Sequence, residues 1–184
     1  YMRIITGSAR GAKLFTLEGQ DVRPTTDRVK QALFNIIQFQ VQGRTVLDLF
    51  AGSGQLGLEA LSRGAKHAVL ADSSKNAVDI IAKNAQRTNL TERVTIAHMD
   101  YTTCLAKQNL RFDLAFLDPP YHKGILEKAL PLTATVMNPG GRIICEHAAE
   151  EALPGQAGDF VRGRGYRYGT VMITVYQHRD MVEQ

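Results

Sequence analysis

The sequence lacks most of the features that identify the structural class of a protein directly, such as cysteine clusters or long apolar runs. Its 184 residues include no tryptophan and only two cysteines, which form no Cys-x-x-Cys pair and predict neither a zinc site nor a disulfide framework. No apolar run reaches the roughly 18 residues of a membrane span, and the first residues contain no signal-peptide core. We therefore expect a cytoplasmic protein that uses no metal and contacts no membrane.

Basic charge, by contrast, is concentrated in one part of the chain. The formal net charge is +4. Residues 1–45 contain seven Lys and Arg against three Asp and Glu, and residues 46–184 contain fifteen of each, so the whole excess lies in the first quarter. A local basic field predicts a polyanionic partner, although a solvated basic edge would have the same composition.

The order of the expected elements predicts an α/β fold. Residues 1–44 form a basic extension, with a hairpin or two extended arms over 3–17 and a helix capped by Thr25 or Thr26. Residues 45–184 alternate apolar strands with amphipathic helices and end in an antiparallel hairpin, which is typical of a doubly wound, mostly parallel, seven-stranded Rossmann-like sheet. The expected strands are 45–49, 67–71, 94–98, 114–117, 142–146, 160–168 and 171–177, and the expected helices are 56–63, 74–88, 102–108 and 125–136, the last stopped by Asn138-Pro139-Gly140-Gly141.

A glycine-rich segment follows the first strand of this domain. Gly52-Ser53-Gly54-Gln55-Leu56-Gly57 matches the dinucleotide fingerprint in its strand–turn–helix context. Asp72 ends the next strand twenty residues after Gly52, where an acid can accept the hydroxyls of a ribose. The pattern indicates an adenosine-containing cofactor and fits NAD as well as S-adenosylmethionine.

Acidic residues at four consecutive strand ends favour S-adenosylmethionine. They are Asp48, Asp72, Asp100 and Asp118. Asp48 would repel a pyrophosphate but can receive an ammonium group, and Asp100 can accept an adenine amino group. Any one of these residues could instead cap a helix, but four in order at the carboxyl edge of a parallel sheet indicate a ligand site.

The segment Asp118-Pro119-Pro120-Tyr121 is suited to a planar group that carries an amine. The two prolines stiffen the loop and remove two backbone donors, so the Asp118 carboxylate and the Pro119 carbonyl remain as acceptors. Tyr121 can stack on a nucleobase. Acceptors on both amino protons would expose the nitrogen lone pair, and Asp118 would stabilise the positive charge that develops there. A structural turn is the alternative.

Three motifs together resemble the RsmD family of bacterial ribosomal RNA methyltransferases. They are Arg23-Pro-Thr-Thr-Asp-Arg-Val-Lys-Gln-Ala-Leu-Phe-Asn35, Asp48-Leu-Phe-Ala-Gly-Ser-Gly54 and Asp118-Pro-Pro-Tyr121. The resemblance implies a class I methyltransferase fold that binds S-adenosylmethionine and methylates the N2 amino group of a guanine in 16S ribosomal RNA.

The resemblance also implies roles for particular positions. It places cofactor contacts at Asp48, Gly52, Gly54, Asp72 and Asp100 and the amino-group site at Asp118, Pro119 and Tyr121. Phe50 and Ala51, in the same glycine-loop motif, are further candidates for cofactor contact, and the basic charge of the first 45 residues predicts RNA contacts at Arg10, Lys13, Arg23 and Arg28. The sequence departs from the family at Asp72, where Glu is common, and at Ser8-Ala9 and Lys30-Gln31, where more basic or Arg-Glu pairs are typical. We expect a monomer acting on 16S rRNA within the small ribosomal subunit or its assembly intermediate.

Several alternatives remain at this point. An adenine-N6 methyltransferase on RNA or DNA shares the Asp-Pro-Pro-Tyr segment, and a non-catalytic NAD-type nucleotide-binding protein shares the glycine loop. A protein-glutamine methyltransferase usually has Asn in place of Asp118. Glu146, at the end of the expected fifth strand, is a minor further candidate for the site.

Overall fold

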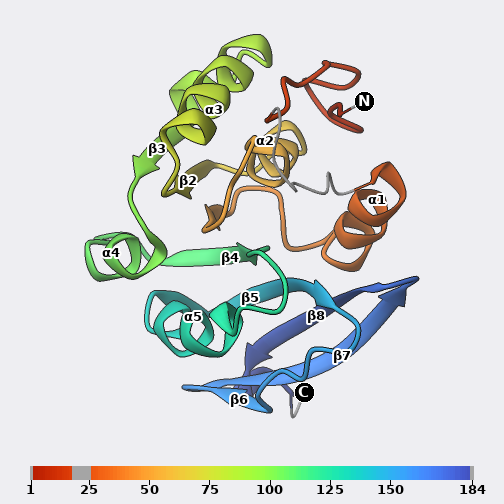
Figure 1. Ribbon diagram of the computed structural model, residues 1–184, viewed down its shortest axis with the longest axis vertical. Coiled ribbons are helices and arrows are strands. Elements are labelled where there is room, and N and C mark those ends of the chain that lie inside the picture. Colours follow the sequence, from red (N-terminus) through yellow and green to blue (C-terminus); the bar gives the residue numbers. More distant parts are fainter. Residues whose placement is uncertain (1, 18–25, 183–184) are drawn as a thin grey trace.

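The computed structural model describes residues 2–17 and 26–182 and contains a mixed sheet in the order β3-β2-β1-β4-β5-β8-β7-β6 (Figure 1). The order reverses direction between β1 and β4, as in a doubly wound fold. The helices are α1 (Asp27–Ile36), α2 (Gln55–Ser62), α3 (Lys75–Arg87), the 3-10 turn η1 (Thr91–Arg93), α4 (Tyr101–Ala106), α5 (Ile125–Ala134) and α6 (Arg179–Val182). The strands are β1 (Thr45–Asp48), β2 (His67–Asp72), β3 (Val94–His98), β4 (Phe112–Leu117), β5 (Met137–Ala148), β6 (Gln156–Ala157), β7 (Phe160–Tyr168) and β8 (Val171–His178).

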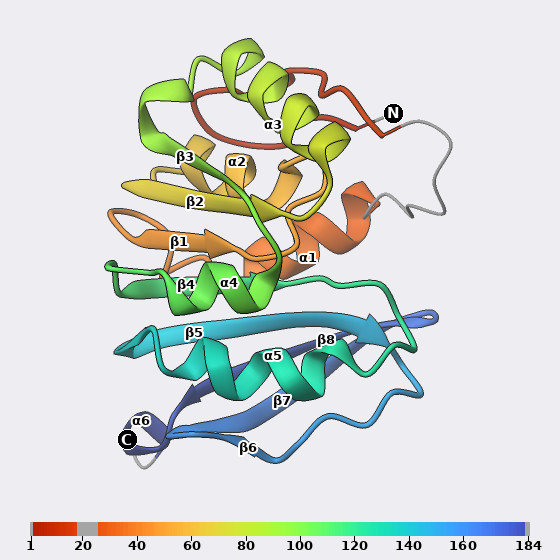
Figure 2. The same cartoon turned by 60° about the vertical axis from the view of Figure 1, so that its left-hand side comes forward.

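The first five strands pair in parallel, and the last three join the sheet by antiparallel pairs. β1 pairs in parallel with β2 and β4, β2 with β3, and β4 with β5. β8 then joins β5 in the antiparallel sense, followed by β7 and β6 (Figure 2). The predicted fold class is confirmed, and the two-residue β6 is an addition to the seven strands expected.

Helices cover both faces of the sheet because neighbouring strand residues alternate between two cores. Val46 and its partner Leu114 belong to a core shared with the N-terminal segment, α1, α2 and α3. Leu47 and its partner Ala115 belong to a second core shared with α4 and α5. No helix within the described ranges has the length and apolar character needed to cross a bilayer.

The junction between α5 and β5 differs from the expectation. The helix ends at Ala134, and Asn138-Pro139-Gly140-Gly141 lies within β5 instead of terminating the helix. The pairing shifts from Phe112–Met137 to Leu114–Arg142, so four residues of β5 stand opposite one of β4 as a bulge. A bulge tolerates the missing proline N–H, and Gly141 is required because a Cβ there would lie 2.9 Å from the Asp113 carbonyl oxygen.

The N-terminal segment folds back on itself and packs against α2. Ile4 N donates to Ala12 O and Leu14 N donates to Met2 O, both at 2.9 Å, so the two arms run antiparallel as expected. Thr26 caps α1 by accepting from Val29 N. Apolar residues of the arms share the first core with α1 and α2.

A buried carboxylate on α2 holds this segment in place. Glu59 is 0% exposed and accepts hydrogen bonds from Ile5 N at 2.8 Å and Thr6 N at 3.1 Å. Arg63 Nε donates to the same carboxylate at 2.9 Å, and Lys30 Nζ lies 3.6 Å from it.

Lys30 itself is fully buried and donates to the Arg3 carbonyl at 2.5 Å. Burial lowers its pKa although the charge of Glu59 opposes that shift. Lys30 therefore contributes nothing to the basic surface that its sequence position suggested.

We expect Glu59→Ala to destabilise the fold by about 3–5 kcal/mol, because the substitution leaves a buried lysine without its counter-charge. Urea denaturation measures the change. The matched control is Asp79→Ala, which removes the salt bridge between Lys75 and Asp79. Because the Asp79 side chain is 55% exposed, this substitution should lower the free energy of unfolding by less than about 0.5 kcal/mol. Equal losses for the two variants would contradict the role given to Glu59.

Candidate active site

The glycine loop joins β1 to α2 in the conformation that its sequence demands. Gly52 and Gly54 have φ values of 58° and 85°, in the left-handed region that favours glycine. Ala51 N donates to Ala71 O at 2.9 Å, which holds the loop against the end of β2. Gly54 is the residue before the first turn of α2, so the helix begins directly behind the loop.

The glycines of this loop serve different purposes. A Cβ on Gly57 would lie 2.8 Å from Leu70 Cδ1, so this glycine lets α2 approach β2. Among the residues that the structure describes, a Cβ on Gly52 would meet nothing within 4 Å. The backbone at Gly52 is therefore free to take a ligand at close range, as an adenosine cofactor requires.

Asp48 lies under the loop and is 2% exposed. Its Oδ2 accepts from Gly57 N at 2.9 Å, which ties the end of β1 to the first turn of α2. Burial raises the pKa of the Asp48 carboxyl to about 7, and the nearby Asp72 adds to the rise. A cationic group placed beside it would favour the ionised form.

Asp72 connects the loop to the next helix. Its Oδ2 accepts from Gly52 N and its Oδ1 from Ser74 N, both at 2.9 Å. The side chain is half-buried and lies at the rim of the loop, where its remaining acceptor capacity suits a pair of hydroxyl groups.

Asp100 is the cap of α4. It accepts hydrogen bonds from Thr103 N and from the hydroxyls of Thr102 and Thr103, and the Thr102 bond in particular holds its pKa below the usual range. The capping alternative raised for such residues therefore applies here, with the carboxylate exposed beside the site.

An aromatic pair borders the same edge. The rings of Phe50 and Tyr101 lie 5.4 Å apart between centroids. Tyr101 was not among the predicted site residues, although its position directly after Asp100 could have indicated it. The pair offers an apolar wall for a planar group.

The Asp118-Pro119-Pro120-Tyr121 segment leaves the end of β4. Asp118 and Tyr121 are half-buried and Pro119 is buried. The Tyr121 hydroxyl donates to Glu146 Oε1 at 3.4 Å. His122 N donates to Glu151 Oε1 at 2.8 Å, and His122 Nε2 lies 3.1 Å from Glu150 Oε1. The segment is thus connected to β5 and to the loop after it.

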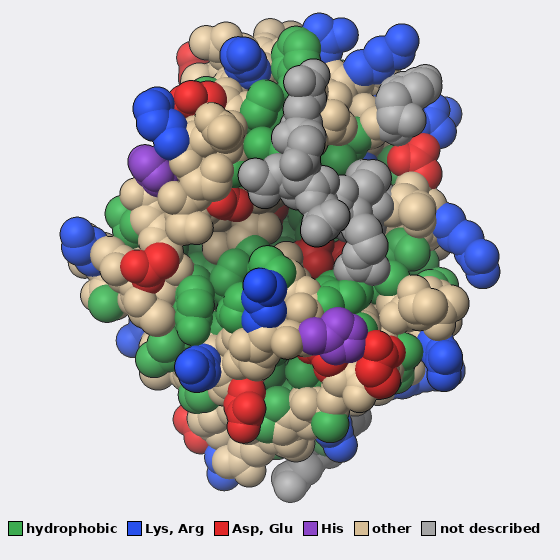
Figure 3. All heavy atoms as spheres, viewed as in Figure 1, with side chains coloured by type: hydrophobic (Ala, Val, Ile, Leu, Met, Phe, Trp, Pro, Cys, Tyr) green, Lys and Arg blue, Asp and Glu red, His purple; other side chains and the backbone are tan. Residues whose placement is uncertain are grey.

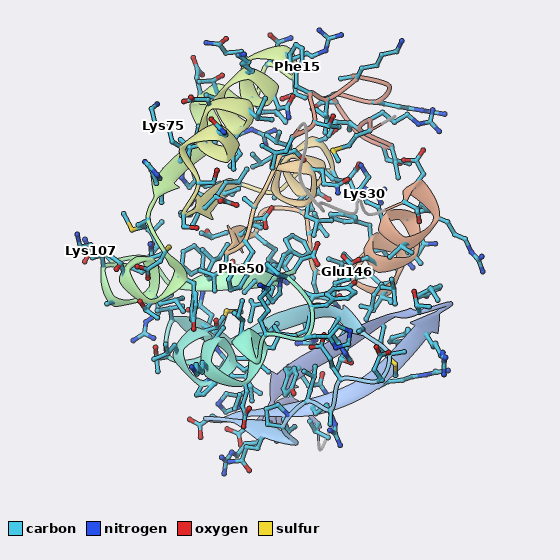
Figure 4. The ribbon with its side chains drawn as sticks, in the orientation of Figure 1. Phe15, Lys30, Phe50, Lys75, Lys107 and Glu146 are labelled. Atoms are coloured by element: carbon cyan, nitrogen blue, oxygen red, sulfur yellow. The ribbon has the colours of Figure 1, made fainter. Side chains whose placement is uncertain are left out.

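Parallel pairing brings these acids to one edge of the sheet. Asp48 is paired with Leu70 of β2 on one side and with Phe116 of β4 on the other. Asp72 comes two residues after Leu70, and Asp118 comes two residues after Phe116. Figure 4 labels Phe50 and Glu146 on the face that Figure 1 presents, and Figure 3 shows acidic and hydrophobic atoms exposed near the centre of that face, with Lys and Arg mostly around its rim.

The residues predicted to contact RNA are dispersed. Ser8 N and Ala9 N, next to Arg10, bind Ser62 at the end of α2 remote from the glycine loop. Lys13 lies midway along the arm, paired in a β-bridge with Arg3. Arg28 is exposed in the first turn of α1, which begins on the same side as the arrowhead of β5 (Figure 2). Arg23 lies outside the described residues.

Comparison with known proteins shows the family of the chain. A family model described as Conserved hypothetical protein 95 matches residues 2–177. The chain belongs to this family, the RsmD family. Its relatives include the Escherichia coli (strain K12) Ribosomal RNA small subunit methyltransferase D, 33% identical over 99% of this chain and 92% of the relative.

Two further relatives of this RsmD-family chain cover nearly all of its length. Bacillus subtilis (strain 168) YlbH, a candidate rRNA methyltransferase by its name, is 38% identical over 97% of this chain and 100% of its own. The solved structure of Escherichia coli yhhF superposes with a TM-score of 0.85 at 34% identity, covering 96% of this chain and 97% of that one.

The raised pKa of Asp48 predicts a pH dependence of stability. The unfolded carboxyl ionises near pH 3.8 and the folded one near pH 7, so between these values the folded state holds a proton that the unfolded state has lost. Rising pH therefore lowers the free energy of unfolding, by at most about 1.4 kcal/mol per unit from this group. Asp48→Asn keeps an oxygen for Gly57 N–H and cannot ionise, so it should lose less stability across this range.

Denaturation midpoints at about pH 5 and pH 7 measure this difference between Asp48→Asn and the unsubstituted protein. Asp79→Asn, which alters an exposed carboxylate, is the control and should follow the unsubstituted protein. Parallel pH profiles for Asp48→Asn and the unsubstituted protein would show that Asp48 is not a strained buried acid.

Proposed function

We propose that the protein transfers a methyl group from S-adenosylmethionine to the exocyclic N2 amino group of a guanine in 16S ribosomal RNA. The observation that carries this proposal is the position of the Asp118-Pro119-Pro120-Tyr121 segment at the end of β4, directly beside the β1 strand that leads into the glycine loop. An acceptor-rich loop for an amine and a loop for an adenosine cofactor thus share one sheet edge. The names of the rRNA methyltransferase relatives support the same substrate class.

The residues present fit S-adenosylmethionine. No described residue fills the space beside the Gly52 backbone, Asp72 can accept the ribose hydroxyls, and Asp48 can receive the ammonium of the methionine group. We expect Phe50 to hold the adenine ring and Asp100 to accept its amino group, with Gly54 and Ala51 shaping the loop. When bound, this cofactor supplies an electrophilic methyl group on sulfur.

The target loop would prepare the amine for attack. The Asp118 carboxylate and the Pro119 carbonyl accept the two N–H bonds of the amino group, and Tyr121 stacks on the base, worth about 1–3 kcal/mol. With both protons held, the nitrogen lone pair turns away from conjugation with the ring. Asp118 then stabilises the positive charge that develops on nitrogen as the N–C bond forms and the bond from the methyl group to sulfur breaks. S-adenosylhomocysteine leaves with the electron pair of that bond, and the nitrogen loses one of its two protons to become a neutral secondary amine.

The same site residues bear on the two alternative functions. An adenine-N6 methyltransferase would use the same acceptors on a different amine. An NAD-binding protein would place a pyrophosphate near Asp48, whose buried carboxyl would then face like charge. The position of Asp48 favours the methyl-donor cofactor.

Transfer of a labelled methyl group tests the proposal. We expect N2-methylguanine in RNA from a strain lacking the modification, with free RNA and assembled small subunits assayed in parallel. Asp118→Ala should lower the rate by about 10²–10³-fold and leave S-adenosylhomocysteine binding by calorimetry nearly unchanged. No label, label on adenine, or binding of NAD without affinity for S-adenosylhomocysteine would refute it.

The exposed cations of the first 45 residues provide a separate prediction. Replacing Arg10, Lys13 and Arg28 together by Gln should weaken RNA binding and reduce the slope of log affinity against log salt by about 0.7 for each phosphate that the variant no longer neutralises. The Arg28→Gln change should contribute more than Arg10→Gln, because Arg10 lies beside the end of α2 remote from the glycine loop. Lys66→Gln, at an exposed lysine before β2, is the control. An unchanged RNA affinity in the triple variant would show that the basic charge of the first 45 residues only keeps the surface solvated.

A further inference from the structure

A second acid lies beside Asp118 at the target loop. β4 and β5 pair in parallel with Phe116 opposite Ile144 and Leu117 opposite Cys145. Continuing this register by one residue places Asp118 beside Glu146. Phe116 and Ile144 both face the core shared with α1 and α2, so the alternation of side chains directs Asp118 and Glu146, two residues further on, to that same face.

Glu146 lies at the edge of the Tyr121 ring, on which the target base is expected to stack. Its residue is only 6% exposed, and the Tyr121 hydroxyl donates to its Oε1 at 3.4 Å. Because the strand register sets Asp118 and Glu146 side by side, we expect a purine that stacks on Tyr121 with its amino group on Asp118 to turn its hydrogen-bonding edge toward the Glu146 carboxylate. Such a carboxylate, when ionised, can accept hydrogen bonds but cannot donate them.

Guanine and adenine differ at the ring nitrogen next to the amine. In guanine N1 carries a hydrogen and is a donor, beside the N2 amino group. In adenine N1 is an acceptor, beside the N6 amino group. Two neighbouring carboxylates therefore match the adjacent donors of guanine, whereas a carboxylate facing adenine N1 would bring two acceptors together and leave both unpaired.

We propose that Glu146 selects guanine over adenine by accepting the N1–H of the base whose N2 amino group lies on Asp118. This inference rests on the proposed function and adds to it the residue that determines the choice of base. Glu146 acts as a specificity-determining residue, distinct from Asp118, which meets the reacting nitrogen.

The test uses an rRNA fragment in which the methylated guanine is replaced by 2-aminopurine. This base keeps the N2 amino group but lacks the N1–H and the O6 atom. For the unsubstituted protein we expect kcat/KM to fall by about 10- to 100-fold with 2-aminopurine, the size of one missing hydrogen bond to a charged group. For Glu146→Gln the guanine/2-aminopurine ratio should drop toward one, because the Gln amide can donate to the unprotonated N1.

The comparison of ratios isolates the N1 hydrogen bond, since the absence of O6 affects both enzymes alike. Glu150→Gln, in the loop after β5 with a side chain 68% exposed, removes the same charge nearby and should keep the original ratio. Tyr121→Phe removes the donor to Glu146 and should lower both rates together. If a thermal unfolding experiment shows that Glu146→Gln does not fold, Glu146→Asp replaces it as the test. This variant keeps a carboxylate and should prefer guanine over 2-aminopurine at a reduced rate.

The outcomes separate this inference from the proposed function. N2-methylguanine formed with the same guanine/2-aminopurine ratio in the unsubstituted protein and Glu146→Gln, or with equal rates on the two bases in the unsubstituted protein, would overturn the role of Glu146 and leave the proposed function standing. Methylation of adenine by the unsubstituted protein would overturn both.

Discussion

Parallel pairing of β1 with β2 and β4 is the constraint on which the site depends. Parallel strands end at a common edge, and the register of Asp48 with Leu70 and Phe116 sets how far each following loop extends beyond it. The glycine loop, Asp72 and the Asp118 segment become neighbours only through this register. A slip of one residue would turn each acid to the opposite face.

Two buried carboxylates then fix what surrounds that edge. Asp48 connects the end of β1 to α2 through Gly57 N, and Glu59, one helical turn along from the loop, receives the N-terminal segment. Asn84 extends the connection, because it binds both Phe15 and the Ser53 carbonyl of the glycine loop. The basic N-terminal segment is thus connected by hydrogen bonds to the loop proposed to hold the cofactor.

Most elements could be predicted from sequence because local signals determine them. Thr26, one of the two residues expected to cap the first helix, does so, and the strand from Val94 to His98 was placed at its observed ends. The error at Asn138-Pro139-Gly140-Gly141 arose because a turn-like composition also suits a bulge, and only the pairing of β5 with β4 distinguishes the two. The roles of Lys30 and Glu59 could not be predicted, since a charged side chain on a helix is usually solvated and its burial is decided by what packs against it.

The sequence by itself determined the succession of strands and helices, the glycine loop and the acids at the strand ends, because each depends on neighbouring residues and on side-chain period. The tertiary structure decided where the charge lies. The excess of the first 45 residues is partly buried in Lys30 and partly distributed from Arg10 to Arg28, and no local pattern encodes those distances. It also placed Glu146 of β5 against Tyr121 of the loop after β4, because the two strands are neighbours in the sheet although α5 separates them in the sequence.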